Sequence, residues 1–183
     1  MAGEEFDAGF HATPDLSTDL YGGGNPGQGR WLYGAQLDWS ELEQSGHRAM
    51  RDDVRRMLAI RKRERAVLAA DLDTETGPRL VGVAYESDVP VPVPYLRWMG
   101  STGILVAGNT DAVRDACLKV HIPVERLKSN IFPDEQFRVT DLWNEAGAKF
   151  YTALQLQNLA LRVRSDRTER GGLCVLKIEP THP

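Results

Sequence analysis

The feature that most constrains this fold is a series of short apolar or alternating segments that runs from residue 80 to residue 178. Each segment has the length of one strand, and Gly, Asp or Pro residues separate neighbouring segments at intervals of about 8–20 residues. The segments cover residues 80–85, 95–99, 103–107, 117–122, 137–140, 156–163 and 173–178. In 117–122 the alternation places Cys117, Lys119 and His121 on one face. The series predicts a mainly β fold, an antiparallel Greek-key β-sandwich with one face of each sheet toward the core.

One long helix is predicted ahead of the strands, over residues 45–65. Its apolar stripe at helical spacing consists of Met50, Val54, Met57 and Leu58. Ser45 is a suitable N-cap, and basic residues gather at the C-terminal end, where they suit the helix dipole. We expect the stripe either to pack against the β-domain or to form an exposed patch that drives association.

The first 44 residues have no sustained hydrophobic period. Prolines and five glycines between Gly22 and Gly29 predict a long irregular loop. Residues 22–27 match G-x-G-x-x-G, but no apolar strand precedes them and no helix start follows, so a dinucleotide site is not supported.

Composition excludes several classes of partner. The 183 residues carry a formal net charge of −4, which argues against a dedicated nucleic-acid binder. No apolar run approaches the about 18 residues that a membrane-spanning helix needs. We therefore expect neither nucleic acid nor a membrane as a partner. The acidic start lacks the basic and then apolar segments of a secretory signal, which leaves the location open with the cytoplasm as the default.

Metal, cofactor and disulfide chemistry have no support in the sequence. The four histidines occur at no metal-ligand spacing, and no G-x-S-x-G elbow is present. Two cysteines, Cys117 and Cys174, are too few for a disulfide framework. We expect no metal site, no cofactor and no catalytic residue.

The candidate binding residues lie near the N-terminus. Glu4 and Glu5 are adjacent, so on a strand they point to opposite faces and cannot form an acid/base pair with each other. Glu5 or Asp7 is suited to accept a sugar hydroxyl. Trp31 and Tyr33 are suited to stack on sugar rings, or equally to pack the loop against a core.

The order of several segments is similar to that in the α-amylase superfamily of glycoside hydrolases. Gly3-Glu4-Glu5-Phe6 resembles the end of the eighth barrel strand, Asp38-Trp39-Ser40 the segment before the last barrel helix, and 54–63 that helix. Segments similar to the family's C-terminal β-domain are 83–85, 95–97, 104–110, 141–143 and 175–179. The chain departs from the family at Val54, where an aromatic residue is common, and in the proline-rich stretch 86–94. The resemblance implies two domains: residues 1–65 as the last strand, loop and helix of an incomplete (β/α)8 barrel, and residues 66–183 as the C-terminal β-sandwich.

The resemblance also implies a function that this chain does not complete. The family's catalytic carboxylates lie in a G-x-R-x-D strand, on the next strand and after an Asn-His pair, and none of these motifs occurs here. The implied function is the C-terminal part of an α-amylase-type glycoside hydrolase or glucosyltransferase acting on α-glucosidic carbohydrates. Its partners would be an α-glucan or sucrose-like carbohydrate, and the missing barrel portion or a second copy.

Two alternatives stay open. One is a stand-alone carbohydrate-binding or protein-interaction β-sandwich module without enzymatic activity. The other is an enzyme outside this family that uses Glu4, Glu5 or Asp7.

Overall fold

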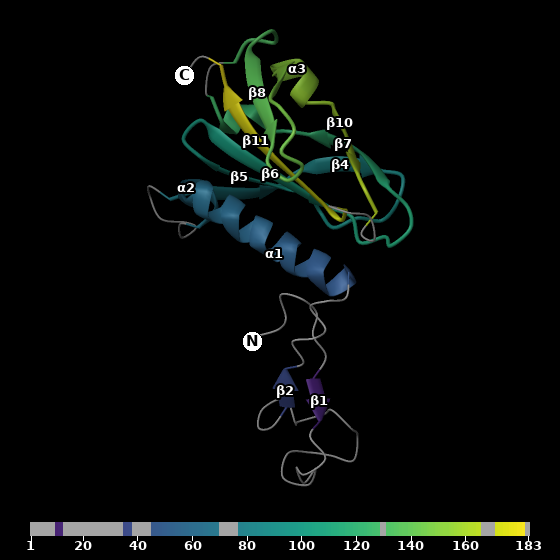
Figure 1. Cartoon of the computed structure of the whole chain (residues 1–183). Coiled ribbons are helices and arrows are strands. Elements are labelled where there is room, and N and C mark those ends of the chain that lie inside the picture. Colours follow the sequence, from purple (N-terminus) through teal and green to yellow (C-terminus); the bar gives the residue numbers. More distant parts are fainter. Residues whose placement is uncertain are drawn as a thin grey trace. The chain divides into compact units, whose positions relative to one another are not determined.

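A computed structural model describes residues 10–12, 35–37, 45–69, 77–128, 131–165 and 171–181 of the chain. The chain divides into two compact units, Met1–Arg56 and Met57–Pro183. The division falls inside the long helix α1 (Ser45–Arg63). The presence of this helix confirms the one long helix that the apolar stripe predicts. Figure 1 labels the elements of both units.

The first unit contains a short antiparallel strand pair. Strand β1 (Phe10–Ala12) pairs with β2 (Ala35–Leu37), with Phe10 opposite Leu37. This corrects the prediction that the segment is irregular throughout. Strands of three residues are too short to produce a recognisable alternation, so the sequence pattern did not reveal them. The candidate strand end at residues 3–6 lies outside the described residues.

The second unit is built on two antiparallel sheets, as the strand series predicts (Figure 1). The larger sheet has the order β3-β5-β6-β11-β8-β9. In that order its strands are β3 (Arg79–Gly82), β5 (Tyr95–Met99), β6 (Thr102–Gly108), β11 (Leu173–Pro180), β8 (Gln136–Asp141) and β9 (Lys149–Thr152). The last strand of the chain, β11, therefore joins two hairpins, β5–β6 and β8–β9, into one sheet.

The smaller sheet has the order β10-β7-β4, with β10 (Leu159–Val163), β7 (Ala116–His121) and β4 (Ala84–Ser87). Every second residue of β7 is buried, beginning with Ala116. Cys117, Lys119 and His121 are exposed together, which confirms the face that the alternation predicts.

The main core contains side chains from both sheets. Its fully buried members include Leu96, Leu105, Phe137 and Ile178 from the larger sheet and Ala116 and Val120 from the smaller one. A second cluster lies on the other face of the larger sheet and consists of Ile60, Val67, Ile104, Leu142, Trp143 and Val175. Val67 belongs to the short helix α2 (Arg65–Leu68). The larger sheet is thus covered on one face by the smaller sheet and on the other by the end of α1 and α2.

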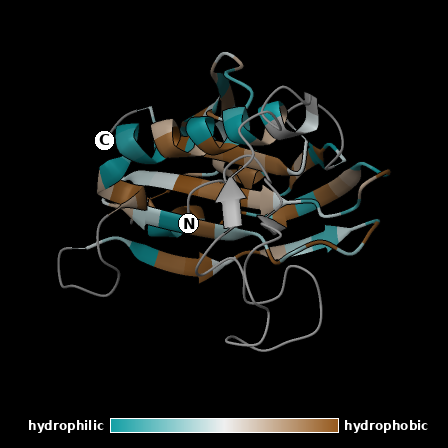
Figure 2. Ribbon diagram, turned by 60° about the horizontal axis from the view of Figure 1, so that its bottom comes forward, coloured by the Kyte–Doolittle hydropathy of each residue, from teal (hydrophilic) through white to brown (hydrophobic). Residues whose placement is uncertain are grey.

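This layering explains the hydrophobic pattern of the central strands. Ile104 faces the helix side and Leu105 the core between the sheets, and both are fully buried. A strand covered on both faces has a continuous apolar run in place of an alternation. Figure 2 shows most of the hydrophobic colour on the strands, whereas α1 is mainly hydrophilic with hydrophobic turns.

The buried face of the helix end differs from the predicted stripe. Met57 and Leu58 are exposed, and so is Met50 in the first unit. Ile60 of α1 and Val67 of α2 are buried in their place. Among the described helices, none has the length and apolar character needed to span a membrane.

Two predicted strands are wrong in their extent. Residues 80–85 were predicted to form one strand, but they belong to β3 and β4, which lie in different sheets. The division falls at Val83, which is buried and whose N–H donates to the carbonyl of Pro94 over 2.8 Å. The chain passes from one sheet to the other there, and alternation carries no signal for such a crossing.

The predicted strand 156–163 is also divided. Its first residue ends the short helix α3 (Ala153–Leu156), and only 159–163 form β10. Thr152 and Gln155 form a capping box at the start of α3, with Thr152 N–H donating to Gln155 Oε1 over 2.8 Å. The T-x-x-Q spacing was a readable signal of this helix, and β9 directly before it was likewise not predicted.

The two cysteines provide a direct test of this architecture. Cys117 is on the exposed face of β7, whereas burial raises the pKa of Cys174 to about 12. Since the thiolate is the reacting form, we expect Ellman's reagent to modify one thiol quickly and the second only on unfolding. In Cys117→Ser the fast phase should vanish. Equal reaction rates for both thiols in the folded protein would contradict the placement of β7 and β11.

Candidate functional site

Four residues are predicted from sequence to contact substrate. Glu5, Asp7, Trp31 and Tyr33 all lie outside the described residues. The structural candidates are therefore three surface pockets of the second unit and the polar residues that hold its loops.

The first pocket lies where the end of α1 meets the larger sheet. It has a volume of about 310 Å3 and is lined mainly by charged and polar side chains. Lys177 Nζ on β11 lies 3.2 Å from Glu64 Oε2 and 3.0 Å from Glu179 Oε1. Glu64 Oε1 also pairs with Arg63 Nε at 3.3 Å. We call Glu64, Lys177 and Glu179 the Lys177 clamp, because they join the residue after α1 to the central strand of the sheet.

The Lys177 clamp is suited to holding the fold rather than to acid–base chemistry. Partial burial by itself would lower the pKa of Lys177, but hydrogen bonds to Glu179 and Glu64 outweigh it and raise that pKa above the ordinary 10.5. Lys177 therefore stays protonated and pairs with both carboxylates. A glycosidase pair needs one free base or nucleophile and one proton donor, which this arrangement does not provide.

The raised pKa makes the contribution of the Lys177 clamp depend on pH. Relative to wild type, Lys177→Met should lower the free energy of unfolding by about 1 kcal/mol at pH 7, since it leaves two carboxylates facing each other. The contribution is fully present below the unfolded pKa of 10.5 and is lost as pH rises through the raised folded pKa. Urea titrations from pH 7 to pH 11 should therefore show the difference between the two proteins shrinking above pH 10.5. A difference that grows with pH would contradict the assignment.

The segment Asp141-Leu142-Trp143 forms a turn at the end of β8. Asp141 Oδ1 accepts the N–H groups of Trp143 and Asn144 at 3.0 and 2.9 Å, and Leu142 N–H donates to the carbonyl of Val175. This geometry directs Leu142 and Trp143 into the cluster that contains Ile60. The segment thus connects the larger sheet to the helix layer.

Asn109 occupies a buried junction after β6. Its Nδ2 donates to the carbonyls of Arg114, Val163 and Arg164 at 2.8, 3.2 and 3.3 Å, and its Oδ1 accepts the N–H of Asp111. The backbone N–H of Asn109 donates to Gly172. One side chain therefore connects the ends of β6 and β10 to the loop before β7.

Two carboxylates secure the same loop. The N–H groups of Arg114 and Val113 and the guanidinium of Arg114 lower the pKa of Asp111 to about 2. The N–H of Ser165 and the side chain of Arg162 likewise lower the pKa of Asp115. Both groups are therefore ionised at neutral pH and engaged with hydrogen-bond donors, so they are structural.

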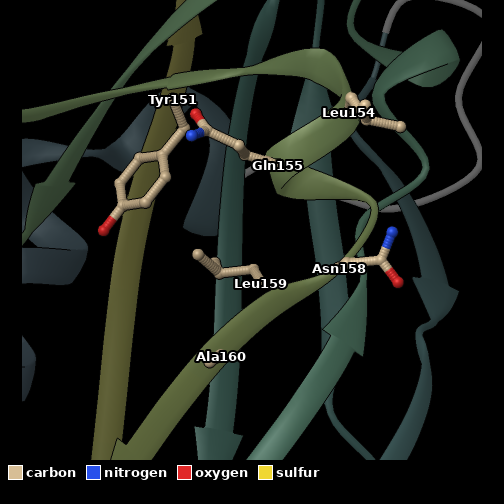
Figure 3. A pocket seen from close by; sticks show the side chains of 6 residues that line it. All are labelled: Tyr151, Leu154, Gln155, Asn158, Leu159 and Ala160. Carbon is tan, nitrogen blue, oxygen red and sulfur yellow. The ribbon is translucent and has the colours of Figure 1, made fainter.

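The second pocket lies beside α3 and has a volume of about 450 Å3. Figure 3 shows Gln155 reaching toward Tyr151, with the Leu159 side chain on the same side, whereas Leu154 and Asn158 point away from the ring. Gln155 Oε1 accepts the N–H of Thr152, and among the described residues no acceptor is bonded to its amide nitrogen, which is therefore able to donate to a ligand. An aromatic ring beside an amide and an apolar floor suits a sugar ring, with the amide donating to a hydroxyl.

The third pocket has a volume of about 590 Å3 and contains a half-buried tryptophan. We call it the Trp98 pocket, and its lining residues are Arg79, Leu80, Val81, Trp98, Glu125 and Arg126. Arg126 belongs to the short helix η5 (Val124–Arg126) and its Cζ lies 6.0 Å from the centre of the Trp98 ring. Two guanidinium groups beside an indole are suited to bind an anion next to an apolar surface.

Comparison with known proteins adds no relative. No family model matches the sequence, and a search of curated proteins finds no significant similarity. Among the described residues, no group of three or more His, Cys, Asp or Glu side chains is placed to hold a metal ion.

Sequence reasoning missed both ligand-sized pockets with aromatic residues. Arg79 and Arg126 are far apart in the chain, and only the pairing of β3 with β5 and the packing of η5 bring them together. Tyr151 precedes the capping box of α3, which was the one readable sign of that pocket.

Proposed function

We propose that this chain supplies the last barrel helix and the C-terminal Greek-key β-sandwich of an α-amylase-type glycoside hydrolase or glucosyltransferase. In this proposal residues 1–65 complete a (β/α)8 barrel whose other strands lie elsewhere, and the whole enzyme acts on α-glucosidic carbohydrates. This chain alone is catalytically incomplete.

The observation that carries the proposal is the position of the family-like segments. Segments 95–97 and 104–110 fall on β5 and β6 and lead into the buried junction at Asn109. Segment 141–143 forms the turn that carries Trp143, and 175–179 lies on the central strand β11. Segments with weak individual signals are thus at positions that determine the fold, which is what a shared domain would require.

The helix end supports the same proposal. Ile60 is buried in the cluster with Trp143, and Glu64 pairs with Lys177. Met57 and Leu58 remain exposed on the same helix. A final barrel helix needs one face for the β-domain and another for its barrel. Leu58, two residues before Ile60, lies on nearly the opposite side of the helix and provides the second face.

Four carboxylates of the second unit have interactions that fit a non-catalytic role. Glycoside hydrolysis requires two carboxyl groups held across the scissile bond, roughly 5–9.5 Å apart. Glu64 and Glu179 share Lys177, and Asp111 and Asp115 accept backbone N–H groups. These four groups are engaged in holding the fold, and in this proposal the catalytic carboxylates belong to the missing barrel portion.

We therefore expect the pure chain to show no turnover of soluble starch, maltooligosaccharides or sucrose, measured as released reducing sugar. Glu5→Gln serves as the matched variant and should give the same result as wild type. Turnover by wild type that Glu5→Gln abolishes would overturn the proposal and favour an enzyme outside this family.

The pocket beside α3 favours a second candidate function, a stand-alone carbohydrate-binding module. Its evidence is the arrangement of Tyr151, Gln155 and Leu159 (Figure 3). A maltooligosaccharide titration separates the two functions. A chain that lacks most of the barrel loops should bind at best at millimolar concentration, through Trp31. Micromolar affinity that survives Trp31→Ala and is lost in Tyr151→Ala would establish the binding module instead.

A further inference from the structure

The Trp98 pocket has properties that the proposed glycosidase function does not require. It lies on the edge of the larger sheet, because β3 is the edge strand. Trp98 on β5 is directly opposite Arg79 on β3, so the two side chains share one face of the sheet.

A glycine makes room for the helix η5, which supplies Arg126 to this pocket. On its other side Trp98 is opposite Gly103 of β6. A Cβ at Gly103 would lie 2.8 Å from Leu127 Cδ2 and 3.1 Å from Leu96 Cδ1, so the absence of a side chain makes room for Leu127. Leu127 is buried and follows directly after η5. Its packing therefore holds Arg126 over the indole.

The charges of the pocket are available to a ligand. Arg79 and Arg126 are both exposed. Among the described residues, neither guanidinium lies within ion-pair distance of a carboxylate, whereas Arg114 and Arg162 each have a close partner. Glu125 is the single acidic side chain of the lining, so the pocket carries a net positive charge on a protein of net charge −4.

From this geometry we propose that the Trp98 pocket binds a phosphorylated hexose. Arg79 and Arg126 hold the phosphoryl dianion, since guanidinium groups form charge-assisted hydrogen bonds with phosphate oxygens. The apolar face of the sugar ring contacts the accessible part of the Trp98 indole. A monoanion gains less from two guanidinium groups in the presence of Glu125, so the dianion is favoured over a simple carboxylate.

A titration of the full chain tests this proposal, followed by NMR through the indole N–H of Trp98. The ligands are glucose 6-phosphate, inorganic phosphate and glucose, and Trp98→Phe assigns the signal. We expect a saturable shift with glucose 6-phosphate, weaker binding of inorganic phosphate, and no shift with glucose. Arg79→Met and Arg126→Met should each weaken glucose 6-phosphate binding by about tenfold, the effect of one charged hydrogen bond.

Two controls keep the result specific. Arg61→Met removes an exposed guanidinium from α1 and should leave the affinity unchanged. In Trp98→Leu, observed by 31P NMR, the preference for glucose 6-phosphate over inorganic phosphate should disappear. Equal loss in Arg61→Met, or no saturable shift with glucose 6-phosphate, would overturn the site. Wild-type affinity for inorganic phosphate equal to that for the sugar phosphate would overturn the role of the indole. None of these results depends on whether the chain completes a glycosidase.

Discussion

Trp143→Ala is expected to lower the free energy of unfolding by about 3–5 kcal/mol, the range for removing a buried large aromatic residue. Trp143 is only 2% exposed and lies in the cluster that joins the helix end to the larger sheet. Removing the indole leaves a cavity beneath Ile60, where helix and sheet cannot close together without moving the turn at Asp141. Urea unfolding followed by far-UV circular dichroism measures the change.

Phe150→Ala is the matched control for this prediction. Phe150 is 60% exposed, so its removal should change the free energy of unfolding by less than about 0.5 kcal/mol. A loss below about 1 kcal/mol in Trp143→Ala would mean that the segment 141–143 does not anchor the helix layer.

Asn109→Asp is the second substitution with a large expected effect, about 3 kcal/mol near neutral pH. The change keeps the shape of the side chain but replaces an amide donor with a carboxylate oxygen. That oxygen would face the carbonyls of Arg114, Val163 and Arg164, which now accept from Asn109 Nδ2. Asn109 is 1% exposed, so water cannot relieve the repulsion.

The cost of Asn109→Asp should depend on pH in a defined direction. Burial and the facing carbonyls raise the pKa of the introduced carboxyl group, because both disfavour its charged form. The destabilisation should be largest above that raised pKa and should shrink as pH falls and the group becomes a neutral donor. Asn158→Asp, at an exposed position between α3 and β10, should cost little at any pH. A cost for Asn109→Asp that is the same at pH 5 and pH 8 would contradict this account of the junction.

Local pattern was sufficient to predict several elements of the second unit. Residues 95–99 are β5, and the alternation of 117–122 places Cys117 and Lys119 on the exposed face of β7. The antiparallel two-sheet architecture followed from the spacing of these strands. These features depend on residues that are close in sequence, and for this reason the hydrophobic periodicity predicts them.

Features that depend on distant neighbours were not predictable. The crossing at Val83 requires knowledge of the Pro94 carbonyl, and the exposure of Met57 depends on Ile60 and Val67 filling the space against the sheet. To predict the Trp98 pocket, one would need to know the register of β3 with β5 and the space left by Gly103. The predicted substrate contacts are Glu5, Asp7, Trp31 and Tyr33, which lie outside the described residues. Their role in contacting substrate therefore stays a prediction based on the resemblance.

The most direct measurement of the central claim is complementation of activity. This chain is co-expressed with an α-amylase-type barrel polypeptide that carries the family's catalytic carboxylate motifs and ends before the eighth strand, and turnover of α-glucans and sucrose is assayed. We predict that the two polypeptides co-purify and act on one of these substrates together, whereas neither does so alone. The double substitution Met57→Lys with Leu58→Lys should weaken the complex. Turnover by this chain alone, or a pair that neither associates nor gains activity, would contradict the claim.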